Sequence, residues 1–269
     1  MDKQLAIAEI LAAVRVNRTP LSVPSAEAIP HDEADAYRVQ DILHNLLSPD
    51  FGAQVGYKIG CTSAVMQVYL GIDHPCAGGL YEGGVHQNGV SLPYKNYVHV
   101  GVECEIAVRL DKDVVMGDVP FTADSITPFV EAYYPAIELV DDRYADWRSV
   151  DPRVLIADDF FAAGCVLGAP VARADAPDLL SVEGRALING HEVGRGTGAD
   201  VLGHPHHALA GLANHLAESD KVLRAGDIVF TGSLVKTEWL NPGDDVLMEL
   251  SGLGSVRAAF PSVGRISEA

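Results

Sequence analysis

Three glutamates are spaced so that they could bind a hard cation. Glu103 and Glu105 alternate with apolar residues through segment 100–110, and this period of two predicts a strand with both carboxylates on one face, roughly 7 Å apart. Glu138 interrupts the apolar run 136–140, where a carboxylate must be paired, protonated or metal-bound because burying a bare charge is costly. Three carboxylates on two strands suit Mg²⁺, which prefers oxygen ligands. A strand with one solvated polar face would give the same pattern for the first two glutamates.

Lys58 could transfer protons beside such a site. It lies in the segment GYKIGCTS at 56–63, flanked by glycines and apolar residues, and it is one of only six lysines in the chain. A nearby cation and partial burial would both lower the pKa of this lysine towards the range used in general acid–base catalysis. A surface lysine with its stem packed along apolar residues is the alternative.

The composition limits the partners. The 269 residues carry 19 Lys and Arg against 37 Asp and Glu, a formal charge of −18. This balance excludes nucleic acid or an anionic membrane as the main partner, because both require basic patches. The chain has neither a transmembrane run of about 18 apolar residues nor a signal peptide, so we expect a cytoplasmic protein. Reduced thiols are expected at the four cysteines, which lack metal-type spacing: Cys61, Cys76, Cys104 and Cys165.

Helical spacing dominates the start of the chain, and short strands dominate the remainder. Two helices are predicted first, one ending before segment 17–20 and one running from the N-cap Asp32 to 48–50. Asn189–Gly190 indicates a hairpin between two apolar runs. Pro205 opens the one clear helix of the β-rich part, since proline suits the first helical position.

This pattern predicts a helical N-terminal segment, 1–74, packed on a β-rich catalytic domain, 75–269, in one compact unit. The histidines of segment 204–207 invite a zinc site, but a helix start is favoured because no Cys or acid partner is evident. Segment 194–198 is glycine-rich, yet it lacks the Lys-Ser/Thr of a phosphate-binding P-loop and is interpreted as a plain loop.

Several motifs, taken together in order, resemble the 2-keto-4-pentenoate hydratases. The most distinctive pair is the lysine segment with the Glu-x-Glu strand, and the N-terminal DEADAYRVQDIL (32–43) resembles the opening helix of that family. The motifs are GYKIGCTS (56–63), VECEIA (102–107), AIELVDDRYADW (136–147), VLGHPHHALAGLANHL (201–216), GDIVFTGS (226–233) and NPGDDV (241–246). With the 4-oxalocrotonate decarboxylases, these enzymes belong to the fumarylacetoacetate hydrolase superfamily. The resemblance covers nearly the whole chain.

The resemblance implies an α+β fold, a mixed β-sandwich roll with its active site at the mouth. It implies that Mg²⁺ or Mn²⁺ is bound by Glu103, Glu105 and Glu138, and that Lys58 is a candidate for proton transfer. Two further groups are implied to lie at the pocket. Thr231, Gly232 and Ser233 would lie near the substrate carboxylate, and Asp142 as a candidate catalytic residue and Arg143 as a substrate-binding residue would lie at its flank.

The chain departs from the family pattern at three places. Cys76 stands where the hydratases have an acid, and Asp73 is the substitute acid that we consider. Segment 158–161 reads Asp-Asp-Phe-Phe where they read Asp-Asn-Ala-Ser, so Cys76, Phe160 and Phe161 should make the pocket more apolar. The arginine that commonly precedes the Glu-x-Glu strand is absent, and His99, Val100 and Gly101 stand there.

The resemblance therefore implies a hydratase that adds water to a 2-hydroxy-2,4-dienoate, giving a 4-hydroxy-2-oxo acid in the catabolism of aromatic compounds. Decarboxylation of a 2-oxo acid of the 4-oxalocrotonate type is the alternative on the same carboxylate platform. C–C bond hydrolysis is another, for which His31 and Glu33 would activate water. A non-catalytic partner subunit is the remaining alternative. We expect a small acid as substrate and a homo-oligomer.

Overall fold

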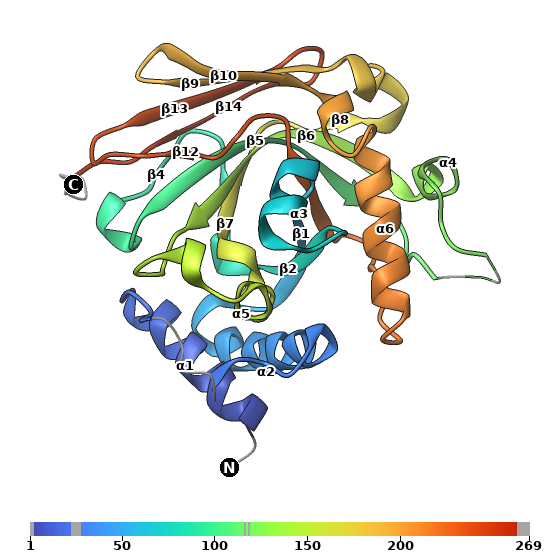
Figure 1. Cartoon of the computed structure of the whole chain (residues 1–269). Coiled ribbons are helices and arrows are strands. Elements are labelled where there is room, and N and C mark those ends of the chain that lie inside the picture. The colour runs from blue at the N-terminus through green and yellow to red at the C-terminus, as the bar shows by residue number, and fades with distance from the viewer. Residues whose placement is uncertain (1–2, 23–27, 116, 118, 263–269) are drawn as a thin grey trace.

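Two β-sheets form the body of the protein, and helices surround them (Figure 1). The structure is a computed structural model that describes residues 3–22, 28–115, 117 and 119–262. Its strands are β1 (Gln54–Gly60), β2 (Cys76–Tyr81), β3 (Val85–Gln87), β4 (Val90–Ser91), β5 (Val100–Leu110), β6 (Val130–Asp141), β7 (Ala162–Leu167), β8 (Val171–Ala172), β9 (Glu183–Ile188), β10 (His191–Thr197), β11 (Ile228–Ser233), β12 (Glu238–Trp239), β13 (Asp245–Leu250) and β14 (Gly254–Ala259). The α-helices are α1 (Lys3–Asn17), α2 (Glu33–Phe51), α3 (Ala64–Leu70), α4 (Ala123–Ile126), α5 (Pro152–Ala157) and α6 (Pro205–Ala217).

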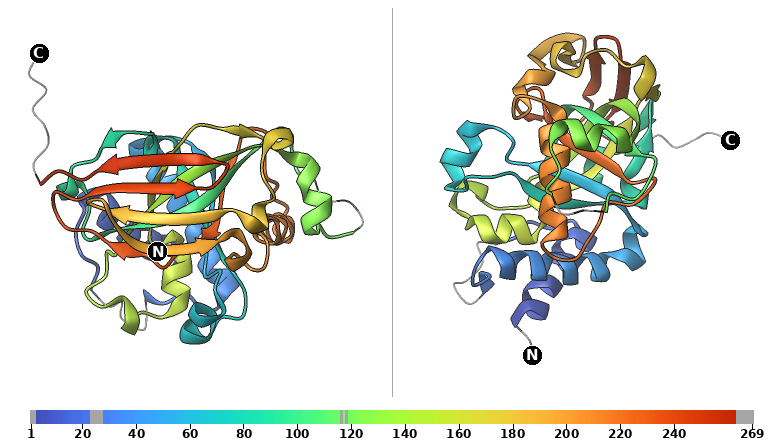
Figure 2. Two further views of the ribbon diagram at one scale, coloured as in Figure 1. Left: turned by 90° about the horizontal axis from the view of Figure 1, so that it is seen from above. Right: turned by 90° about the vertical axis from the view of Figure 1, so that its right-hand side faces the viewer.

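The larger sheet has the order β2-β1-β11-β5-β6-β7-β3, with β12 pairing to β5 and β8 pairing to β6. The smaller sheet has the order β10-β9-β13-β14-β4 and covers the larger one when the molecule is seen from above (Figure 2). One face of β5 packs into the core between the sheets through Val102, Cys104 and Ile106, which cluster with Val246 and Met248 of β13. The opposite face of β5 is therefore left for the glutamates. The mixed fold agrees with the α+β prediction.

The predicted second helix forms as α2. The Asp32 side chain accepts a hydrogen bond from the Asp35 backbone N–H and caps its first turn. The predicted end at 48–50 is too early, because α2 runs to Phe51 with Pro49 inside its last turn. Gly52 then ends the helix with φ +82°, a conformation that glycine adopts without steric cost.

Local signals in the β-rich part are confirmed. Asn189 and Gly190, both with positive φ, connect β9 to β10 as the predicted hairpin. The helix that opens at Pro205 is α6, whose buried residues include Leu209, Leu212 and Leu216. All four cysteines are free and buried, as expected for reduced thiols.

The larger sheet crosses the boundary predicted at residues 74 and 75. Strand β1 belongs to the segment 1–74, which is thus not wholly helical, and it pairs with β2 on one side and with β11 on the other. Helices α1 and α2 pack on each other at the bottom of Figure 1, and α5 packs on α2. The division into two domains stays a prediction. No helix among the described residues is long and apolar enough to span a membrane.

Candidate active site

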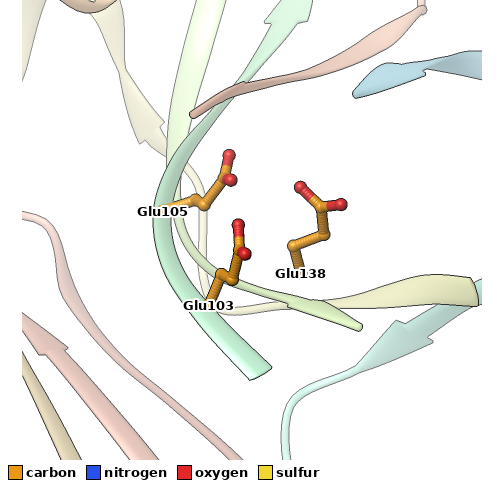
Figure 3. A group of neighbouring side chains, drawn as sticks. All are labelled: Glu103, Glu105 and Glu138. Atoms are coloured by element: carbon orange, nitrogen blue, oxygen red, sulfur yellow. The ribbon is translucent and has the colours of Figure 1, made fainter. Parts of the chain in front are cut away.

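The three predicted glutamates lie together on one face of the larger sheet. Glu103 of β5 is directly paired with Glu138 of β6, and Glu105 follows two residues along β5. One carboxylate oxygen from each residue lies within 4.8 Å of the others, and the three side chains point towards a common space (Figure 3). Glu105 and Glu138 are 0% and 2% exposed, whereas Glu103 is half-buried.

Some carboxylate oxygens of this cluster have partners and others do not. Glu105 Oε2 accepts a 2.9 Å hydrogen bond from the Gly232 N–H, and the Thr237 hydroxyl donates to Glu103. Glu105 Oε1 and Glu138 Oε2 are buried and accept no hydrogen bond from the described residues. Buried oxygens without donors are costly, and an all-oxygen set suits Mg²⁺, Ca²⁺ or Mn²⁺. The residues therefore fit a divalent cation.

The electrostatics agree with that fit. Burial raises the pKa of Glu103 to about 7, and the negative charge of Glu138 adds to the effect. Burial and the same neighbour raise the pKa of Glu105 well above its ordinary value. The three carboxylates repel one another in a space that excludes most water, and a bound cation would relieve that repulsion.

Lys58 reaches this cluster from β1. Its Nζ lies 2.9 Å from Glu138 Oε1, and the residue is only 5% exposed. Burial lowers the pKa of Lys58, but Glu138 and Glu103 outweigh it and the pKa is raised above its ordinary value. This direction applies without a bound cation, and the lowered pKa expected beside a cation stays a prediction. The expectation that Lys58 lies beside the glutamates is confirmed by the 2.9 Å contact.

Phe160 lies beside the ammonium group of Lys58. A Cβ atom added to Gly60 would lie 3.1 Å from Phe160 Cδ1 and 3.3 Å from Lys58 Nζ, so this glycine makes room for both. Phe161 packs edge-on against both Phe160 and Tyr144, with ring centroids 6.3 and 5.6 Å away. Of the two predicted phenylalanines, Phe160 is the one next to the proposed proton carrier.

The segment Thr231–Ser233 lies at the deep end of the cluster. The Thr231 hydroxyl donates to the Ile106 carbonyl at 2.8 Å, so it is engaged with β5. A bulge in the β11–β5 pairing turns the Gly232 N–H towards Glu105. Gly232 has φ +115°, and a Cβ there would lie 2.6 Å from Thr62, so these two residues approach each other closely. The Ser233 hydroxyl makes only contacts of 3.4 Å, to Cys104 O and to the Val235 N–H.

Arg143 does not extend freely into a pocket. Its guanidinium is 2.9 Å from Asp158, and the residue is 3% exposed. Arg15 of α1 also binds Asp158 at 2.7 Å, and the Tyr144 hydroxyl donates to the same carboxylate at 2.8 Å. Its donors serve Asp158 and the Ala162 carbonyl, and its role in substrate binding stays a prediction.

Asp159 holds an unusual backbone segment in place. Its carboxylate lies 2.7 Å from His44 Nε2, 2.9 Å from the Gly79 N–H and 3.0 Å from Arg15. Burial raises the pKa of Asp159, but His44 and Arg15 outweigh it and lower the pKa to about 2. Residues 159, 160 and 161 have φ of 54°, 48° and 66°, and each such non-glycine residue costs about 1–3 kcal/mol. The ion pairs stabilise this strained turn, which carries Phe160.

The other predicted site residues fall in different surroundings. Asp142 is half-buried, its N–H donates to the His99 carbonyl at 3.0 Å, and burial raises the pKa of its carboxyl group. Cys76 is fully buried opposite Gly60. Asp73 is fully exposed and lies 3.9 Å from the His74 ring, so the structure places this substitute acid on the surface, apart from the buried carboxylates.

Sequence reasoning missed the residues that β12 and its preceding turn bring to the site. Thr237 binds Glu103, and Trp239 is paired with Gly101 of β5. The signal was Gly101 itself, since an isolated glycine within a strand often marks the close approach of another segment. A Cβ there would lie 2.8 Å from the Trp239 ring.

The histidines of the two alternative site predictions, His31 and those of segment 204–207, have structural contacts instead. His31 is 88% exposed and contacts Asp32, and Glu33 contacts His74 at 3.1 Å. His206 is buried, with one ring nitrogen 2.9 Å from the Tyr133 hydroxyl and the other 2.7 Å from the Thr127 hydroxyl. Neither group joins the carboxylate cluster.

The fold agrees with comparisons to known proteins. The family described as Fumarylacetoacetate (FAA) hydrolase C-terminal matches residues 84–260, and the chain belongs to this family. A 2-keto-4-pentenoate hydratase of Burkholderia vietnamiensis (strain G4 / LMG 22486) is 36% identical over 241 residues, which cover 88% of this chain and 90% of that protein.

Decarboxylases of the same family are also similar. A 4-oxalocrotonate decarboxylase of Pseudomonas putida is 31% identical over 227 residues, or 84% of this chain and 85% of that protein. The solved structure of 4-oxalocrotonate decarboxylase from Pseudomonas putida G7, complexed with magnesium and adipate, superposes with a TM-score of 0.90. It is 28% identical and covers 96% of this chain and 97% of that chain. The resemblance inferred from the motifs is confirmed.

Proposed function

We propose that the protein is a divalent-cation-dependent hydratase that converts a 2-hydroxy-2,4-dienoate into a 4-hydroxy-2-oxo acid. The observation that carries this proposal is Lys58 Nζ at 2.9 Å from a cluster of three carboxylates with unpartnered buried oxygens. The hydratase name of a relative that is 36% identical supports this activity. Mg²⁺ or Mn²⁺ is the cation we propose, and the magnesium complex of the structural neighbour supports the first of these.

Glu103, Glu105 and Glu138 would hold the cation through their carboxylate oxygens. A cation bound there would bind a 2-oxo acid and stabilise the negative charge that develops on its oxygens. Thr237 and the Gly232 N–H orient two of the three carboxylates by hydrogen bonds.

Lys58 is proposed to deliver a proton to the far end of the dienoate, C5, and to be reprotonated by the proton that the 2-hydroxyl group releases. Water then adds across the C3–C4 double bond of the resulting 2-oxo-3-enoate, with its hydroxyl group going to C4 and its proton to C3. The Ser233 hydroxyl, whose protein contacts are long, is positioned to turn towards the substrate carboxylate. Phe160 shields Lys58 from solvent on one side.

The test uses the purified chain alone, stripped of metal with EDTA and reconstituted with Mg²⁺. The substrates are 2-hydroxypenta-2,4-dienoate and 4-oxalocrotonate, and products are identified by NMR and by CO₂ release. We expect the five-carbon dienoate to be hydrated only when Mg²⁺ is present. Full turnover without metal, or no turnover by the chain alone, would contradict the proposal; the second outcome would favour the partner-subunit alternative.

Decarboxylation is the second candidate function. The match to the solved 4-oxalocrotonate decarboxylase, with a TM-score of 0.90 over nearly the full length, favours it specifically. Release of CO₂ from 4-oxalocrotonate without hydration of the dienoate would establish this alternative instead. The homo-oligomer stays a prediction.

A further inference from the structure

Trp239 fills the space above Gly101, which has no side chain of its own, on the face of β5 that carries Glu103 and Glu105. Gly101, Glu103 and Glu105 alternate along β5 and share one face. Trp239 of β12 is paired with Gly101, and a Cβ on that glycine would lie 2.8 Å from Trp239 Cε3 and 2.9 Å from Thr237 Cγ2. The indole therefore lies over Gly101, next in line after Glu103.

His99 extends this row outwards. Its imidazole is stacked on the Trp239 indole, with ring centroids 4.7 Å apart and planes 17° from parallel. The two rings together form a flat surface, which we call the aromatic platform. Strand β12, which carries Trp239, pairs with the start of β5, and both strands are labelled in Figure 1.

Side-chain exposure increases from the carboxylate cluster towards the aromatic platform. Glu105, at the deep end, is 0% exposed, Glu103 is half-buried, and Trp239 is 37% exposed. His99 beyond it is exposed. At the buried end, Gly232 lies against Thr62. Exposure thus increases along the row in one direction, which is the direction in which a chelated molecule can extend.

We propose that Trp239 and His99 bind the tail of the substrate and select a flat apolar group on its far carbon atoms. This inference rests on the proposed function and adds the substrate class to it. Positions 101 and 103 are roughly 7 Å apart along β5, which a 2-oxo acid of about five or six carbons spans. An aromatic tail would stack on the indole or the imidazole.

The charges at the platform disfavour an acidic tail. Asp142 lies opposite His99, since its N–H donates to the His99 carbonyl at 3.0 Å. A second carboxylate on the substrate would be repelled by Asp142 and Glu103 and would lose hydration. An apolar ring carries no charge and would incur neither cost.

The experiment compares two chelating probes, 2-oxo-5-phenylpentanoate and 2-oxopentanoate, in the presence of Mg²⁺. Binding is followed by the fluorescence of Trp239 in a Trp147→Phe background, where it is the remaining tryptophan of the chain. We expect the phenyl probe to quench this emission and to bind about tenfold more weakly to Trp239→Ala, measured by calorimetry. Binding of 2-oxopentanoate should change less than twofold, and Trp239→Phe should retain most of the preference.

Controls separate this inference from the proposed function. Trp147→Phe alone should leave the affinity for both probes unchanged. His99→Ala is the second variant, to be used if Trp239→Ala fails to fold, and it should weaken binding of the phenyl probe only. Equal loss for both probes, no loss for either, or no binding of either probe by the parent protein would overturn the platform. If the parent binds both probes but does not hydrate dienoates, the proposed function fails while the binding comparison still decides the platform.

Discussion

Glu105 is the residue on which the cation site depends most. It is fully buried, it receives one backbone hydrogen bond from Gly232, and its other oxygen has no donor among the described residues. A buried carboxylate in this state is stable only when it is protonated or bound to a cation. A cation bound to Glu105 should therefore increase the free energy of unfolding of the protein.

Replacing Glu105 by Gln should remove cation binding and activity together. The amide keeps the shape but supplies a neutral oxygen in place of the charge, so we expect Mn²⁺ affinity to fall by at least about tenfold. Calorimetric titration with Mn²⁺ measures this, and Glu192→Gln, an exposed carboxylate in ion pairs with arginines, is the control. Unchanged Mn²⁺ affinity in Glu105→Gln would exclude Glu105 as a ligand.

Replacing Lys58 by Met should reduce kcat while the cation still binds. Loss of one general acid–base group costs roughly 10²–10⁴-fold in rate. Lys58→Arg should not restore turnover, because a guanidinium stays protonated. The measurements are kcat and Mn²⁺ affinity, with the exposed Lys95→Met as control. Near-normal kcat in Lys58→Met would show that the lysine is structural and that another group carries the proton.

At the scale of elements, alternation along single strands could be predicted, but strand pairing could not. The alternation of apolar and acidic residues along β5 predicted that Glu103 and Glu105 share one face of the strand, because side chains alternate between the two faces. Strand β1 was missed, since glycines interrupt its apolar pattern; a Cβ at Gly56 would lie 1.9 Å from the Ile228 carbonyl. Likewise, Trp239 reaches the site through a pairing between residues more than a hundred positions apart.

His206 connects α6 to β6 and should make that junction sensitive to acid. Burial, with repulsion from His204, lowers the pKa of His206 from 6.5 to about 4. The unfolded chain therefore binds a proton below pH 6.5 that the folded chain does not bind until about pH 4, so stability is lost as the pH falls through this window. The loss should approach about 2 kcal/mol at pH 5.

Urea unfolding at pH 7.5 and pH 5 measures this loss. His206→Gln should show a smaller decrease in the free energy of unfolding between the two pH values than the parent, although it starts lower through altered contacts to Tyr133 and Thr127. His191→Gln, on the exposed start of β10, is the matched control and should behave like the parent. An identical pH dependence in His206→Gln would contradict the assignment.

At the scale of the whole molecule, the N-terminal helices support the catalytic sheet through buried charge. Arg15 of α1, with a side chain 7% exposed, reaches Asp158 and Asp159 more than 140 residues away. These aspartates hold the strained turn that places Phe160 beside Lys58. The sequence indicated Phe160 as a pocket residue, but not the arginine behind it, because ion pairs between distant segments leave no local pattern.

Arg15→Met should therefore affect both stability and activity. Removing one partner of a buried ion pair costs about 3–5 kcal/mol, and His44 and Arg143 should keep the loss near the lower limit. We also expect kcat to fall as Phe160 loses its fixed position. Thermal unfolding and kcat are the measurements. Arg38→Met, which removes the contact of an exposed arginine with Asp35, should change stability by less than about 1 kcal/mol.

The pairing of Gly101 with Trp239 has a consequence for how this enzyme could change over evolution. One volume above β5 can be filled either from position 101 or from position 239, because a Cβ on Gly101 would already lie 2.8 Å from the indole. A large residue at one position requires a small residue at the other. Substitutions at these two sites should therefore covary among relatives, and a lineage that changes its substrate tail would have to replace both, passing through an intermediate with either a clash or a cavity.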